Sequence, residues 1–121
     1  MILVDTSIWV DHFRQADSAL SKLLLEGKAA CHPFVIGELA CGNLQNRPII
    51  LTLLSALPSL AKAGDLEILD FVERHRLMGR SIGLIDVHLL ASCMLDGALL
   101  WTRDKRLKEV AGELGSVHTP G

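Results

Sequence analysis

Residues 1–10 read MILVDTSIWV, and this stretch sets an acid directly after an apolar run. The run Ile2–Val4 is apolar, which is typical of a short strand sealed in a core. A carboxylate follows directly at Asp5, although burying an unpaired carboxylate is costly. Asp5 is either the N-cap of a helix that begins near Thr6, or a group at the carboxyl end of a central strand, where open α/β sheets place their ligands. Residues 1–10 alone leave both interpretations open.

Composition limits the classes of protein to consider. A chain of 121 residues, half of them hydrophobic, is long enough for one domain with a real core, so we predict a single domain over residues 1–121. The 14 acidic and 12 basic residues argue against a broad basic surface for nucleic acid. Three separated cysteines, Cys31, Cys41 and Cys93, lie among apolar neighbours, so we expect buried, reduced thiols and a cytoplasmic protein. We expect neither a signal peptide nor a membrane span, because the apolar runs are short and interrupted.

Short β-type runs alternate with helical patterns along the chain. Strands are predicted at 2–4, 29–32, 66–69 and 98–102, with a fifth candidate at 116–119. Helices are predicted at 7–14, 18–26, 33–41, 48–57, 70–78, 84–95 and 104–114. This alternation implies parallel pairing and a sheet covered on both faces, so the predicted fold class is α/β.

Four acids stand where core residues are expected. Each lies at the end of an apolar run or inside one: Asp5, Glu38, Asp86 and Asp104. A single acid of this kind is most simply a helix cap or half of a buried salt bridge. Four at once, with no comparable set of interior bases, instead predict carboxylates that converge on one rim of the sheet.

Clustered carboxylates repel one another unless a cation lies among them or some become protonated. Oxygen-only ligands favour magnesium or manganese over zinc, and the histidines show no zinc spacing. The four acids therefore predict a site for one of these two metals.

Hydroxyls and bases lie next to these acids. Ser7 comes two residues after Asp5, and Thr102 two residues before Asp104, so both are candidates to support a carboxylate. A helix cap at Ser7 and an ordinary strand end at Thr102 remain alternatives. The candidate contacts to substrate phosphates are Arg103 and Arg106, which otherwise form a solvated first helical turn.

These groups occur in one order along the chain: DTS at 5–7, Glu38, DVHLLA at 86–91 and TRD at 102–104. Together they resemble the PIN-domain family, and most closely the VapC-like toxins of bacterial and archaeal toxin–antitoxin pairs. The resemblance covers essentially the whole chain. It implies a three-layer α/β/α sandwich with a central parallel sheet. It also implies a magnesium- or manganese-dependent endoribonuclease whose four catalytic acids are those named above, a homodimer, and a cognate antitoxin that silences it. For such an enzyme we expect Asp5 and Asp86 as the principal metal ligands and Asp104 as a ligand, either directly or through a water. We expect Glu38 to be a ligand or to orient the attacking water.

Other interpretations stay open. The segment from Ile49 to Lys62 is unusually apolar, and a dimer face, an antitoxin groove and a plain core helix all explain it. A signalling receiver domain is disfavoured, because Asp5 has no acidic neighbour and 117–120 ends without a lysine. A catalytically silent PIN-like binding domain, or a DNA-associated regulator acting with a partner, remains an alternative. The sequence does not identify the RNA target or the number of metal ions.

Overall fold

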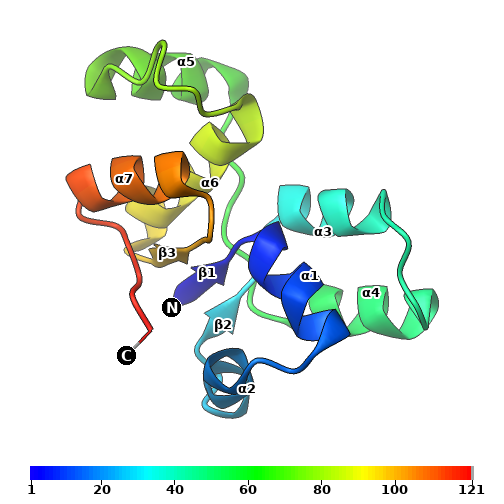
Figure 1. Ribbon diagram of the computed structural model, residues 1–121. Helices are drawn as coiled ribbons and strands as arrows, with labels where there is room; N and C mark the ends of the chain where they lie inside the picture. The colour runs from blue at the N-terminus through cyan, green and yellow to red at the C-terminus, as the bar shows by residue number, and fades with distance from the viewer. Residues whose placement is uncertain (121) are drawn as a thin grey trace.

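The computed structural model describes residues 1–120, which form a small parallel sheet between two groups of helices (Figure 1). The strands are β1 (Ile2–Val4), β2 (Ala29–Ala30) and β3 (Leu99–Trp101), in the order β2-β1-β3. Both pairings are parallel, with Ile2 opposite Ala29 on one side and Leu99 on the other. The predicted α/β class is therefore confirmed.

Six helices connect these strands and a seventh follows β3 within residues 1–120. Figure 1 shows α1 to α4 on one side of the sheet and α5 to α7 on the other, which is the predicted three-layer sandwich. Their bounds are α1 (Thr6–Arg14), α2 (Ser18–Leu25), α3 (Pro33–Ala40), α4 (Arg47–Ala56), α5 (Asp65–His75), α6 (Leu84–Asp96) and α7 (Lys105–Glu113).

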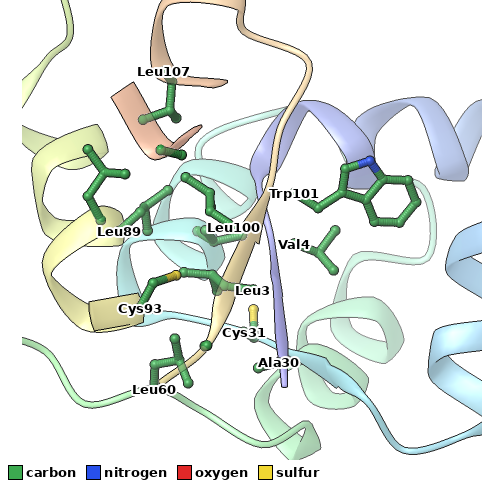
Figure 2. Packing of buried hydrophobic residues seen from close by; sticks show 14 of the residues in the cluster. Leu3, Val4, Ala30, Cys31, Leu60, Leu89, Cys93, Leu100, Trp101 and Leu107 are labelled. Atoms are coloured by element: carbon green, nitrogen blue, oxygen red, sulfur yellow. The ribbon is translucent and has the colours of Figure 1, made fainter. Parts of the chain in front are cut away.

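The core lies on both faces of the sheet. Leu3 and Leu100 point toward Cys93 of α6, whereas Val4 and Trp101 point to the opposite face (Figure 2). All five side chains are buried. Because both faces are covered, the strands are continuous apolar runs, and polar groups emerge only where the strands end. That edge, at the carboxyl ends of β1 and β3, is where the acids lie.

The predicted strand at 66–69 is wrong, because these residues form the first turns of α5. Its sequence LEIL suits a strand or a helix equally well. The Glu67 side chain decides in favour of the helix: its Oε1 accepts a hydrogen bond from Gly64 N at 3.0 Å. The strand at 66–69 and the helix at 70–78 are thus one helix. The fifth strand candidate, at 116–119, is reduced to a single parallel bridge between Leu100 and Val117.

The apolar segment from Ile49 to Lys62 divides between core and surface. Leu54 and Leu60 are buried, so the core-helix interpretation holds for one face of this segment. Ile49 and Leu53 are exposed, and a partner-binding face stays a prediction for them.

The cysteines follow the prediction in two cases out of three. Cys31 and Cys93 are buried, and burial raises the pKa of both thiols, that of Cys93 to about 12. Cys41 is exposed, because it is the C-cap residue that follows the last helical residue of α3 at the protein surface. Within the part of the chain that the structure describes, no helix is long and apolar enough to cross a membrane.

Candidate active site

Asp5 is both the last group of a strand and a helix cap. Its backbone N–H donates to the Trp101 carbonyl at 3.0 Å, which ties it to the end of β3. Its side chain is 7% exposed, and the two carboxylate oxygens have different partners. Oδ1 accepts from Thr6 N at 2.8 Å, and Oδ2 accepts from the Thr102 hydroxyl at 2.7 Å. The two interpretations of the opening sequence are therefore compatible.

The Thr102 hydroxyl joins two of the predicted acids. It donates to Asp5 and accepts from Asp104 N at 3.1 Å. Asp104 caps α7, where its Oδ1 accepts from Arg106 N and Leu107 N at 3.0 and 3.1 Å. Thr102 is buried, so its rotamer is fixed by these bonds. The parallel pairing of β1 with β3 brings the first and the last of the four predicted acids together.

Glu38 is held by a residue that the sequence did not single out. The Thr6 hydroxyl, at the start of α1, donates to Glu38 Oε1 at 2.8 Å. The neighbouring hydroxyl of Ser7, which was predicted, meets only the N–H of Arg103, at the outer limit of 3.5 Å. Thr6 stands next to Asp5 in the sequence, but no pattern reveals a partner 32 residues away.

Asp86 completes the group from the first turn of α6. Its Oδ2 accepts from Gly83 N at 3.2 Å, which caps the helix. Burial raises the pKa of Asp86, the Gly83 bond opposes that change, and the negative charges of Asp5, Asp104 and Glu38 raise it further. Asp86 therefore lies within electrostatic reach of the other three predicted acids.

The two predicted phosphate contacts are placed differently. Arg103 pairs with Asp11 at 2.6 Å and with Asp17 at 3.1 Å. Asp17 also caps α2 through Leu20 N, and this bond, together with the Arg103 guanidinium, lowers the pKa of Asp17. Arg103 therefore joins the β3–α7 loop to the α1–α2 loop. Arg106 is exposed and forms no ion pair within residues 1–120.

The donor set fits a hard divalent cation. Among residues 1–120, the ion pairs involve other carboxylates, and none of the four site acids has a Lys, Arg or His partner. No three His, Cys, Asp or Glu side chains of the described residues lie close enough together to hold a metal ion by themselves. Magnesium is usually held by one or two carboxylates together with waters and substrate phosphates, so an open carboxylate group without cation partners suits it.

The fold and the site define a small α/β protein with unpaired acids at the carboxyl edge of a parallel sheet. Residues 2–113 match the PIN domain, and the chain belongs to the PIN-domain family. It is 48% identical over 116 residues to Ribonuclease VapC32 of Mycobacterium tuberculosis, across 95% of this chain and 94% of that relative. The resemblance to VapC-like members of the family is thereby confirmed.

Solved structures share the fold. A toxin–antitoxin complex from Klebsiella pneumoniae has a TM-score of 0.70 at 21% identity, covering 100% of this chain and 98% of that chain. FitAcB from Neisseria gonorrhoeae has a TM-score of 0.61 at 17% identity, covering 99% and 98%. At these identities the likeness supports the three-layer fold alone.

Proposed function

We propose that this protein is the ribonuclease toxin of a toxin–antitoxin pair and hydrolyses RNA phosphodiester bonds with magnesium or manganese. One observation carries the proposal. Three carboxylates from separate parts of the chain, Asp5, Asp104 and Glu38, lie near enough to Asp86 to raise its pKa, and none of the four acids has a cation partner within residues 1–120. The relative that shares 48% of its residues is named a ribonuclease, which supports RNA as the substrate.

The chain's own groups have distinct roles in this proposal. Asp5, Asp86 and Asp104 would hold the metal, which supplies charge neutralisation at the phosphate and a more acidic water. Thr102 fixes Asp5 relative to Asp104 through its two hydrogen bonds. Glu38 is exposed and held on one oxygen by the Thr6 hydroxyl, which leaves the other oxygen to orient the attacking water.

Partners are also part of the proposal. The structural neighbour from Klebsiella pneumoniae is a toxin–antitoxin complex, which supports a cognate antitoxin for this chain. The exposed Ile49 and Leu53 on α4 offer apolar surface for the antitoxin or for a second copy in a homodimer. A cytoplasmic location agrees with the free cysteines of the described chain.

The test is cleavage of a structured RNA by protein freed of any antitoxin. We expect cleavage in millimolar magnesium or manganese, none in excess chelator, and none by Asp5→Asn. Cleavage undiminished by chelator would remove the metal mechanism. A folded wild-type protein that binds RNA but never cuts it would favour the silent binding domain.

A further inference from the structure

Side-chain amides are rare in this chain, and most of them lie in one loop. The sequence contains four, at Gln15, Asn43, Gln45 and Asn46, and the last three fall in the α3–α4 loop. Asn is common in turns because its side chain bonds to nearby backbone, but Gln is not. Within residues 1–120 none of the three loop amides forms a hydrogen bond, so these groups do not serve the loop itself.

Another side chain holds the loop in place. Arg47 donates to the Gly42 carbonyl at 3.1 Å and also to the Ala40 carbonyl. Asn46 adopts a left-handed backbone with φ of 53°, a conformation that Asn tolerates better than most residues. The loop therefore presents its amides from a backbone that is already fixed.

The loop amides line a cleft of about 670 Å³ that begins at the acid site. Thr6 and Glu38, which are hydrogen bonded to each other, form part of its wall. The exposed face of α1 forms another part and continues to Arg14, about 12 Å further along the helix axis. Leu39, which is buried, also lines the cleft.

The far end of the cleft carries a positive charge. Arg14 is exposed, lines the cleft, and forms no ion pair within the described residues. Along α1 the cleft thus runs from Thr6, which binds Glu38, to the Arg14 guanidinium, and the three loop amides line the same cleft. Val10 and Leu39 supply apolar surface along the same path.

We propose that this cleft binds one unpaired nucleotide of the RNA beside the bond to be cut, and that Asn43 and Gln45 select its base. The inference rests on the proposed ribonuclease function. Each amide carries donors and an acceptor, so it matches the mixed edges of a base. Sequence-specific recognition of RNA targets unpaired bases through those edges, with flat contact to their faces. Arg14 is placed to pair with a neighbouring phosphate.

A protein segment fits this cleft less well than it fits another place on the chain. A second cavity, of about 490 Å³, lies between α1, α2 and α4 and is lined by Trp9, Leu53 and Leu57 among other mainly apolar groups. Apolar surface of that kind is typical of protein partners. The amide-lined cleft shares Phe13 and Ile50 with that cavity, but half of its lining residues are polar or charged, and Glu38 of the acid site is one of them.

The test separates base selection from cleavage. A pool of random single-stranded RNA is bound to Asp86→Asn in chelator, and the retained RNAs are sequenced. On this background we compare Asn43→Ala/Gln45→Ala with the matched control Gln15→Ala. We expect a preference of roughly tenfold for one base, the effect of one to two hydrogen bonds. The double variant should lose it, the control should keep it, and the near-isosteric Gln45→Glu should change which base is preferred.

The outcomes are distinguishable from failure of the nuclease proposal. If Asp86→Asn shows no base preference, the proposal that the cleft selects a base is wrong. It is also wrong if the double variant is folded and keeps the preference. Loss of antitoxin binding in the double variant with RNA selection unchanged would assign the cleft to the protein partner and overturn it as well. If RNA selection depends on the amides but the wild-type protein never cleaves RNA, the proposed nuclease function is wrong and the proposed base selection by the cleft still holds.

Discussion

Replacing Asp86 with Asn tests whether the acids form a metal site or merely stabilise the fold. The Asp86 carboxylate caps α6 through Gly83, and Asn can still accept that hydrogen bond with its amide oxygen. The structure raises the pKa of Asp86, through burial and then through Asp5, Asp104 and Glu38, which means that the fold disfavours the charged form. We therefore expect metal-free Asp86→Asn to be as stable as wild type or more stable.

The magnitude follows from two opposing effects. Loss of a negative charge at a helix N-terminus costs about 0.3–1 kcal/mol. Relief of burial and of repulsion from three carboxylates exceeds this, since the pKa is raised in spite of the Gly83 bond. Each 1 kcal/mol of net gain raises the melting temperature of a 121-residue protein by roughly 3–6 °C.

Metal reverses the order of the two proteins. Manganese at about 100 times its dissociation constant stabilises the wild type by roughly 2.7 kcal/mol, whereas Asp86→Asn, which lacks one ligand, gains much less. The assay is thermal melting of both proteins at neutral pH in chelator and in millimolar manganese. Glu113→Gln is the control, because Arg80 lowers the pKa of Glu113 far from the site. It should melt slightly below wild type and keep the full manganese shift.

One result would refute this reasoning. If metal-free Asp86→Asn melts well below wild type and still gains the full manganese shift, the carboxylate is a structural cap. Asp86 would then not be a metal ligand.

Three further predictions concern two of the site acids, Thr102 and the buried His32. Asp5→Asn and Glu38→Gln should each lose most cleavage activity, and the double variant should lose little more, since residues that act as one unit are not additive; Asp96→Asn should cleave like wild type in the same assay. Thr102→Val should lose roughly 1–3 kcal/mol by leaving the Asp5 Oδ2 acceptor and the Asp104 N–H donor unpaired, and should cleave poorly, whereas Thr102→Ser should retain both stability in denaturant titration and turnover. Burial lowers the pKa of His32 to about 4, so its imidazole is neutral in the folded protein at neutral pH. Its contribution to stability is therefore complete above about pH 6.5 and falls as pH drops toward 4, by roughly 3 kcal/mol; urea titration should show a weaker pH dependence in that window for His32→Gln.

The places of the acids could be predicted because each breaks an apolar run. Asp5 after Ile2–Val4 and Asp104 after the last strand are visible as charges at the ends of buried segments. Parallel pairing then sets their strand ends side by side. The element type at 66–69 could not be predicted, because LEIL satisfies both periodicities and a single bond from Gly64 N to Glu67 favours the helix.

The contacts that organise the site lie between distant residues, and no local pattern contains them. Thr6 reaches Glu38 across 32 positions, and Arg103 reaches Asp11 across 92. From the sequence, Arg103 was indicated as a phosphate contact because it lies next to Asp104. The structure places its guanidinium on Asp11 and Asp17 instead, a choice that depends on how α1 and α2 pack beside the β3–α7 loop.

The most direct test of the central claim is cleavage of one defined RNA in water enriched in oxygen-18, with mass spectrometry of the product ends. The account predicts one labelled oxygen in the phosphomonoester end of the product, formed with manganese by wild type and absent in chelator and with Asp5→Asn. An unlabelled 2′,3′-cyclic phosphate would contradict it, because the RNA's own 2′-hydroxyl and not water would then be the nucleophile. Equal cleavage in chelator would also contradict it, because the reaction would then need no metal.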